Sequence, residues 1–393
     1  MKTLRKRALD VTSGVCAGLL LCGGAGCGGG SSAPRTGTIA TVAGTGVAGD
    51  GADALAPLKT RLYLPQDMTV GPDGRLFVVD WNNHRVRVID ADGLMRIVAG
   101  VGELGLASDD PSSARLNHPT NVAFNPLGPP NQMVIAAWHN SRVKTVDLDQ
   151  PPDANGVDIC GTGKRGFAGN GGPASVATLD LPVAVVFNAA GDMLIADQAN
   201  QMIRSVDHAT GIISTIAGVG HCADAVNPNP CVLNDEGPAI SAGFHFPIGQ
   251  AATPGGRIAM DPAGNIYVAD TENFRVRKID TAGIVHTFAG GSYGVAGDGG
   301  PAVEAQLGRV SDVAIGPDGS VYIADTDNSC VRVVSPAGII TTFAGKCGTG
   351  GFSGDGGPAT AALLDRPYGV EVTSAGDVYV ADTHNQRIRI IYH

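Results

Sequence analysis

The chain has 393 residues, of which 57 are glycine and only 16% are charged, and its formal net charge is −10. Many glycines and few charges suit short buried strands that are joined by tight turns. The acidic balance repels phosphate backbones and therefore argues against a nucleic acid as the partner.

The N-terminus predicts an export signal. Four basic residues occur within the first seven positions, and an apolar run rich in small residues follows at residues 11–26. This run is too short and too rich in glycine to span a bilayer stably. We therefore interpret residues 1–26 as a signal peptide.

The segment around Cys27 resembles the cleavage site of a bacterial lipoprotein, in which the cysteine is lipidated and becomes the mature N-terminus. The sequence departs from that pattern at Gly24, where leucine is usual. We expect lipidation at Cys27, with simple cleavage and secretion as the alternative. Residues 27–36, rich in glycine and serine, would then form a flexible tether.

One sequence unit recurs six times after this tether. Each copy reads as an apolar strand, a D-x-x-N-x-R-V-R motif and a second apolar strand. The copies begin at Leu76, Met133, Met193, Ile266, Val321 and Val378. Because each repeated unit must bury its apolar faces against its neighbours, such self-similarity predicts a repeat architecture.

Each unit contains four short strands. A strand and a tight turn precede the motif, as at residues 312–319, and a strand ending in Ala-Gly follows it, as at residues 338–345. No stretch has the periodicity that a long helix needs. A four-stranded antiparallel sheet that recurs in this way is a blade of a β-propeller.

The two ends of the chain predict how the ring closes. The sixth copy ends at Ile391 and has no strand after it, whereas a matching strand occurs at residues 37–44. We expect this N-terminal strand to complete the last blade, which removes two exposed sheet edges. The predicted fold is an all-β, closed six-bladed β-propeller over residues 37–393, with four antiparallel strands per blade.

The V-Y-V-A-D-T-x-N-x-R motif and the G-D-G-G-P-A loops at residues 297–302 and 354–359 resemble the NHL repeat. The loops also resemble those of the teneurin propeller and of exported bacterial NHL proteins. NHL propellers include protein-binding and RNA-binding platforms, receptor sensor domains and the peptide amidating lyases. The resemblance therefore implies the fold but leaves the function open.

Two kinds of metal site can be tested on the sequence. Amidating lyases place zinc-binding histidines directly after the proline that opens an inner strand. The residues at those places here are Gln66, Thr120, Val183, Ile248, Ser311 and Tyr368. None is a histidine, and His118, which precedes its proline, is expected to stand alone.

Calcium-using propeller enzymes suggest another set of candidates. Asp67, Asn121 and Asp312 lie one position further along their inner strands, and strand alternation could turn them toward the channel. The alternative is that they cap local turns or hydrogen-bond channel water. We expect no cofactor, with calcium as the one possibility to test.

The residues that recur in every unit are interpreted as structural. The aspartates are Asp80, Asp197, Asp270, Asp325 and Asp382, and Ala137 replaces them in the second unit. We expect the aspartates and the following asparagines to bond backbone amides in the reversal between the second and third strands. The arginines alternate along a strand and should cover the adjacent blade with their aliphatic stems.

The places where the units differ are better candidates for function. Both tryptophans, Trp81 and Trp138, follow the aspartate position in adjacent units. Two exposed rings on one face, with His84 and His139 nearby, would suit a glycan or a peptide. The alternative is that each indole packs over its blade edge. A loop at residues 219–255 is expected to rise from the same end.

Cysteine usage indicates an oxidising compartment. We expect one disulfide between Cys222 and Cys231, in the loop after the third unit, and another between Cys330 and Cys347 in the fifth. Cys160 is left over and is expected to be buried and inert.

These observations predict an exported, lipid-anchored, non-catalytic scaffold that binds a protein, peptide or glycan. Binding would use the loop-rich face, the end that carries the D-x-x-N reversals and the G-D-G-G-P-A loops. The alternative is a propeller hydrolase or lyase, similar to lactonases or amidating lyases, with a cation at the channel mouth. We expect a monomer in the bacterial cell envelope, held to the membrane only by its lipid anchor.

Overall fold

The computed structural model describes residues 35–106, 114–154, 156–220, 233–249 and 252–393. The chain divides into two units, residues 1–33 and residues 34–393, and the described residues all belong to the second unit. The predicted signal peptide, the lipidation site Cys27 and the predicted Cys222–Cys231 disulfide lie outside the described residues.

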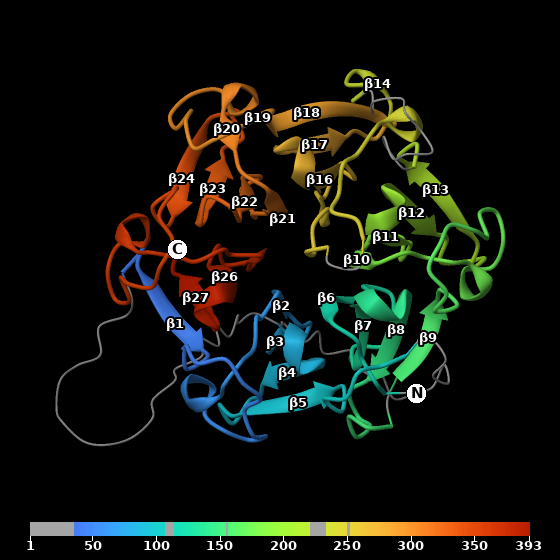
Figure 1. The fold of residues 1–393 in the computed structure, drawn as a ribbon, viewed down its shortest axis with the longest axis horizontal. Coiled ribbons are helices and arrows are strands. Elements are labelled where there is room, and N and C mark those ends of the chain that lie inside the picture. Colours follow the sequence, from blue (N-terminus) through green and yellow to red (C-terminus); the bar gives the residue numbers. More distant parts are fainter. Residues whose placement is uncertain (1–34, 107–113, 155, 221–232, 250–251) are drawn as a thin grey trace, which may run out of the picture. The chain divides into compact units, whose positions relative to one another are not determined.

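The described residues form six antiparallel sheets arranged as a ring, which confirms the six-bladed propeller (Figure 1). Blade one consists of β2 (Asp67–Val70), β3 (Leu76–Asp80), β4 (Arg85–Ile89) and β5 (Met95–Ala99). Blade two consists of β6 (Pro119–Phe124), β7 (Gln132–Ala137), β8 (Arg142–Asp147) and β9 (Gly156–Cys160). Blade three consists of β10 (Pro182–Phe187), β11 (Met193–Asp197), β12 (Met202–Val206) and β13 (Ile213–Ala217).

The second half of the ring repeats this order. Blade four consists of β15 (Ile258–Met260), β16 (Ile266–Asp270), β17 (Arg275–Ile279) and β18 (Ile284–Gly290), with β14 (Gly237–Pro238) at its outer edge. Blade five consists of β21 (Val310–Ile315), β22 (Val321–Asp325), β23 (Cys330–Val334) and β24 (Ile340–Ala344). Blade six consists of β25 (Gly369–Val372), β26 (Val378–Asp382), β27 (Arg387–Ile391) and β1 (Ile39–Ala43). A short parallel pair, β19 (Ser292–Tyr293) and β20 (Gln306–Leu307), lies between blades four and five.

The ring closes as the sequence predicts. Strand β1 pairs antiparallel with β27, and Ile39 lies opposite Ile391. Gly44, which follows β1, has a φ of 93°, and a side chain there would collide with the backbone carbonyl of Gln386. Glycine is therefore needed where this strand ends.

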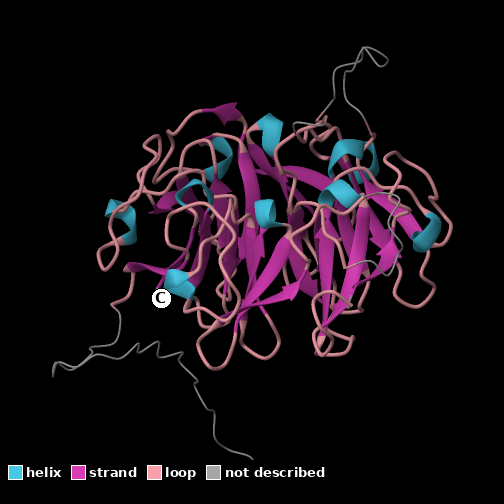
Figure 2. Ribbon diagram, turned by 60° about the horizontal axis from the view of Figure 1, so that its bottom comes forward, coloured by secondary structure: helices cyan, strands magenta, loops and turns pink. Residues whose placement is uncertain are grey.

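The helices among the described residues are three-residue 3-10 turns (Figure 2). One set follows the second strand of a blade: η2 (Trp81–Asn83), η3 (Trp138–Asn140), η5 (Gln198–Asn200), η7 (Thr271–Asn273) and η10 (Thr383–Asn385). The other set lies in the connectors between blades: η1 (Pro57–Lys59), η4 (Ala174–Val176), η6 (Ala239–Ser241), η8 (Ala302–Glu304) and η9 (Ala359–Ala361). The reversals and connectors were expected from the sequence, but their 3-10 conformation was not.

The recurring aspartates hold buried networks, of which blade one is an example. Asp80 accepts hydrogen bonds from the backbone amide of Tyr63 at 2.8 Å, from Asn83 Nδ2 at 2.8 Å and from Arg87 Nε at 2.7 Å. The amide partner lies in the connector before the inner strand, and not in the reversal as expected. Asn83 also donates to the carbonyl of Gly49, so the network ties the reversal to the connector. The arginine head is fully buried and belongs to the blade interior.

The cysteine predictions within the described residues agree with the structure. Cys330 and Cys347 form a disulfide, with their Cα atoms 5.0 Å apart. Cys160 is a free, buried thiol, and burial raises its pKa to about 12. No helix in the described part of the chain is long and apolar enough to cross a membrane.

Candidate functional site

The first strands of the blades line the central channel, and one layer of six residues surrounds its axis. Each member is paired with the residue that precedes the recurring aspartate position, as Asp67 is with Val79. The layer consists of Asp67, Asn121, Ala184, Arg257, Asp312 and Gly369. The three predicted metal candidates therefore share a layer, and an arginine shares it with them.

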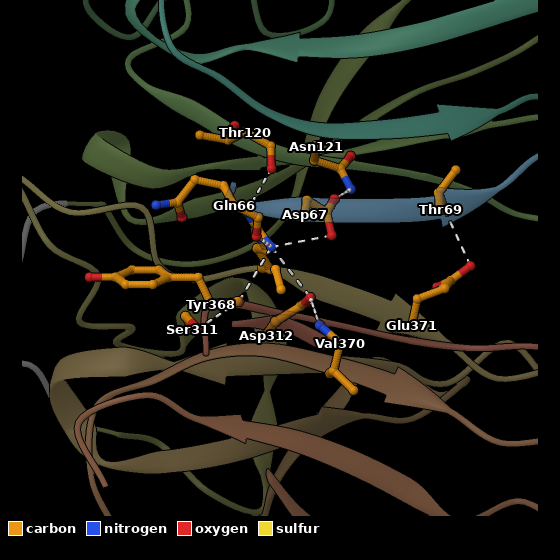
Figure 3. Close-up of polar contacts among 12 residues, drawn as sticks. Gln66, Asp67, Thr69, Thr120, Asn121, Ser311, Asp312, Tyr368, Val370 and Glu371 are labelled. Carbon is orange, nitrogen blue, oxygen red and sulfur yellow. Dashed lines mark hydrogen bonds and ion pairs between the residues drawn. The ribbon is translucent and has the colours of Figure 1, made fainter. Parts of the chain in front are cut away.

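The Arg257 guanidinium lies between the two aspartates. Its Nη1 atom is 3.4 Å from Asp67 Oδ1 and 3.4 Å from Asp312 Oδ2, and Arg257 is 1% exposed (Figure 3). The same side chain donates to the carbonyl of Gln66 at 3.0 Å and to that of Thr120 at 2.6 Å. A fixed guanidinium cation thus occupies the place between the two carboxylates where the sequence suggested a metal ion.

The other metal candidate, Asn121, also has a protein partner. Its Nδ2 atom donates to Asp67 Oδ2 at 2.9 Å, and its Oδ1 atom accepts from the amide of Val185. Asp312 accepts from the amide of Val370 at 3.0 Å. Val185 belongs to blade three and Val370 to blade six, so these contacts and those of Arg257 join all six blades at the axis.

Arg257 was missed because blade four carries an insertion after Pro247. Counting forward from that proline leads to Ile248, which is 48% exposed and lies outside the inner strand. Counting back from the recurring aspartate would have found the residue, because Arg257 precedes Asp270 by the same interval as Asp67 precedes Asp80.

A further carboxylate, Glu371, lies on the channel wall beyond this layer. Its Oε1 atom accepts a hydrogen bond from Thr69 Oγ1 at 3.3 Å (Figure 3). Desolvation, followed by the charges of Asp67 and Asp312, raises the pKa of Glu371 to about 8. Burial likewise raises the pKa of Asp67 and of Asp312. The channel interior therefore holds three carboxyl groups and one guanidinium.

A cavity of about 270 Å³ opens on the loop-rich face at the mouth of this channel. Its polar and aromatic lining comes from the residues after the inner prolines, from the reversals and from the insertion of blade four: Gln66, Trp81, Trp138, His139, Thr253, Tyr368 and His384. Gln66 connects the cavity with the layer below, because its backbone carbonyl accepts the hydrogen bond from Arg257. Arg257 therefore lies directly beneath the cavity.

Three polar atoms in this lining are buried and have no hydrogen-bond partner. They are Gln66 Oε1, Trp81 Nε1 and His139 Nε2. Gln66 as a residue is only 3% exposed. Buried polar groups are nearly always paired in folded proteins, so each unpaired group requires an explanation. A ligand in the cavity provides one.

Trp138 is fully buried, so the expectation of two exposed indole rings is wrong for this residue. Its Nε1 atom donates to Gln198 Oε1 at 3.1 Å, and its ring stacks on that of His139. Gln198 Nε2 in turn donates to the carbonyls of Pro247, at 2.7 Å, and Thr253, at 3.1 Å. The indole thus packs against its neighbour blade and supports the insertion of blade four, whereas Trp81 is only partly buried.

The two predicted histidines meet through a third. The ring of His118 lies 4.4 Å from that of His84 and 4.9 Å from that of His139, which corrects the expectation that His118 stands alone. Burial lowers the pKa of His118 to about 3 and that of His139 to about 4, and it also lowers that of His84. These imidazoles are neutral near pH 7. His139 lines the cavity and His84 does not.

Among the described residues, no group of three or more histidine, cysteine, aspartate or glutamate side chains is arranged to hold a metal ion. The fold and the site define a six-bladed β-propeller in which five blades carry a buried Asp-Asn-Arg network and the channel mouth forms a small cavity. The model of the teneurin NHL domain matches residues 58–236, and that of the NHL repeat matches residues 251–279, 307–334 and 364–391. The chain belongs to the NHL-repeat family.

Relatives of known identity support this assignment. Teneurin-m of Drosophila melanogaster is 28% identical over 359 residues, which are 85% of this chain and 12% of that protein. Protein SUPPRESSOR OF QUENCHING 1, chloroplastic, of Arabidopsis thaliana is 26% identical over 351 residues, which are 86% of this chain and 31% of that protein. The chain therefore spans less than a third of either relative.

Solved structures show the same fold at lower sequence identity. A protein of unknown function from Bacteroides thetaiotaomicron has a TM-score of 0.63 and 15% identity, with coverage of 90% of this chain and 74% of that one. An auxiliary nutrient binding protein from Bacteroides ovatus has a TM-score of 0.61 and 17% identity, with coverage of 91% and 76%. At such identities the likeness concerns the fold alone.

Proposed function

We propose that this chain is a non-catalytic binding protein that holds a protein, peptide or glycan on its loop-rich face. The observation that carries the proposal is the cavity at the channel mouth, whose lining contains three buried polar atoms without a partner. A concave, mostly apolar site with a few converging polar groups is the usual form of a ligand site. The auxiliary nutrient binding protein from Bacteroides ovatus has a similar fold, which is compatible with this function but does not specify it.

The test is a binding screen in which the purified propeller is applied to glycan and peptide arrays. Trp81→Ala should abolish the signals that the unmodified protein gives, because Trp81 contributes both apolar surface and an unpaired donor. Leu127→Ala is the matched control, since Leu127 is 58% exposed and lies in the hairpin turn between β6 and β7, at the opposite end of the strands. Equal binding by the Trp81 variant would refute the proposed site.

The alternative function is a hydrolase or lyase that uses a cation at the channel mouth. It is favoured only by the convergence of Asp67, Asn121 and Asp312, and Arg257 already supplies the positive charge between the two carboxylates. Elemental analysis of the purified protein distinguishes the two functions. We expect no stoichiometric calcium or zinc, and one bound ion per chain would revive the alternative.

We also propose that the protein is exported and anchored by a lipid on Cys27. The Cys330–Cys347 disulfide supports an oxidising compartment. Labelling with a radioactive fatty acid should mark the unmodified protein in the membrane fraction, and Cys27→Ser should lose both the label and the membrane association. A Cys27→Ser protein that stays in the membrane fraction would contradict the anchor.

A further inference from the structure

The cavity at the channel mouth also constrains the chemistry of its ligand, if the proposed function holds. Drug-sized ligands occupy pockets of roughly 300–1,000 Å³. A cavity of about 270 Å³ therefore has room for a single ring or side chain. Whatever larger molecule binds to the loop-rich face can place only one small group inside.

The lining carries no ionised side chain among the residues that the structure describes there. Its titratable members are His139, His384 and Tyr368; burial lowers the pKa of both histidines and raises that of the tyrosine. All three are therefore uncharged near pH 7. A charged group would lose its hydration on entry and would find no counter-ion in the lining.

The unpaired polar atoms belong to three lining residues of the adjacent blades one and two. Gln66 Oε1 is an acceptor and Trp81 Nε1–H a donor in blade one, and His139 Nε2 in blade two is either, depending on its tautomer. An aliphatic group would leave all three unpaired, which costs free energy at each atom. A typical polar side chain has its hydrogen-bonding atoms at one tip and offers fewer of them than these three residues could use.

A pyranose ring has the complementary arrangement. Its hydroxyl groups project around the ring, and each can donate and accept. Its C–H faces are apolar and can pack against aromatic surface, which Trp81 and Tyr368 supply in this lining. The rest of the wall is uncharged and includes Leu64, Thr253 and Pro254.

We infer that the channel-mouth cavity binds one uncharged pyranose ring, either as a free sugar or as the end of a glycan. The ring sits above the Arg257 layer and takes hydrogen bonds from blades one and two. This inference rests on the proposed function and narrows it to a carbohydrate.

The chain provides its own probe for the test. It contains two tryptophans, and both line the cavity. Tryptophan emission is therefore followed while methyl glycosides of glucose, galactose, mannose and N-acetylglucosamine, and neutral oligosaccharides ending in them, are added. Glucuronic acid and glucosamine serve as the ionised counterparts.

We expect a saturable emission change with at least one neutral sugar, and dissociation constants at least about tenfold higher for its ionised counterpart. A response to the methyl glycoside identifies a free sugar as sufficient, whereas a response to the oligosaccharide alone identifies a glycan end. Gln66→Leu should raise the dissociation constant about tenfold through loss of the acceptor. Gln150→Leu, a change at an exposed turn residue, should leave it unchanged.

Equal affinity for the ionised sugars would overturn the inference, and so would a Gln66→Leu protein that is folded by circular dichroism and binds normally. Saturable changes with array-selected peptides but with no neutral sugar would also overturn it, while the binding function would stand. Absence of any ligand on both glycan and peptide arrays would refute the proposed function itself.

Discussion

Arg257 illustrates how one residue decides what the channel can do. Without it, Asp67 and Asp312 would face the axis as two buried carboxylates with no cation between them. With it, the layer becomes a set of hydrogen bonds that joins all six blades. The guanidinium also reaches the carbonyls of Gln66 and Thr120, while Asn121 and Asp312 accept hydrogen bonds from amides of blades three and six. The layer therefore has a structural role: it joins the blades beneath the proposed site.

Replacement of this residue should be severe. Arg257→Leu leaves two buried carboxylates without their partner, and breaking a buried ion pair typically costs about 3–5 kcal/mol. The free energy of unfolding, measured with urea, should fall by about that amount at pH 7. Arg309→Leu is the control, because Arg309 is an exposed arginine. A loss no larger than that of the control would mean that the guanidinium does not hold the layer together.

Glu371 should make stability depend on pH. Its pKa in the folded protein is about 8, above the value of roughly 4.3 that an unfolded glutamate has. The folded state therefore retains a proton that the unfolded state releases, and stability falls as pH rises between about 4 and 8. In Glu371→Gln this fall should be shallower, as seen in Tm values from pH 5 to 9. Glu304→Gln, at an exposed position, should retain the full slope.

At the level of the blade, the buried Asp-Asn-Arg network explains why the D-x-x-N-x-R-V-R motif recurs. Blade two lacks this network, because Ala137 occupies the aspartate position. There, Asn140 Oδ1 accepts the hydrogen bond from the backbone amide of Asn117. Lys144, in place of the buried arginine, pairs with Asp158 of the outer strand at 2.6 Å. The blade thus keeps a buried ion pair although its partners have changed.

Removal of the aspartate from a blade that retains its arginine should therefore be costly. Asp197→Ala leaves Arg204 buried without its carboxylate and leaves the amide of Asp180 without its acceptor. We expect a loss of about 3–5 kcal/mol in the free energy of unfolding. The companion variant Ala137→Asp should not stabilise blade two, since the cation there is already paired. A gain in stability from Ala137→Asp would contradict the view that Asp158 already satisfies Lys144.

At the level of the whole ring, the fold could be predicted from the sequence and the site only in part. Blade number and closure follow from repetition, because six equivalent units and one detached strand have few ways to bury their faces. Arg257 could not be found by counting residues forward from Pro247, because blade four has an insertion between that proline and its inner strand. The burial of Trp138 depends on Gln198 of the next blade, a contact that no local pattern encodes.

Closure by β1 is also the feature on which the stability of the whole ring should depend most. Ile39 is fully buried and packs in the cluster between blades five and six. Ile39→Asp should detach the strand, lower Tm and expose the edge of β27, so that the protein associates in a concentration-dependent manner. Ile39→Val, which keeps the apolar contact, should cost only about 0.5–1.5 kcal/mol and remain monomeric. Normal sedimentation of the Ile39→Asp protein would argue against this view of closure.

We propose that this propeller binds its ligand on the loop-rich face, at the channel mouth. Hydrogen–deuterium exchange with and without an array-selected ligand tests it most directly. We predict slower exchange at residues 63–66, 81–84, 138–141 and 383–386, which surround the cavity, and no change at the opposite hairpin turns, residues 72–75, 125–131 and 188–192. Protection confined to those hairpin turns would contradict the claim.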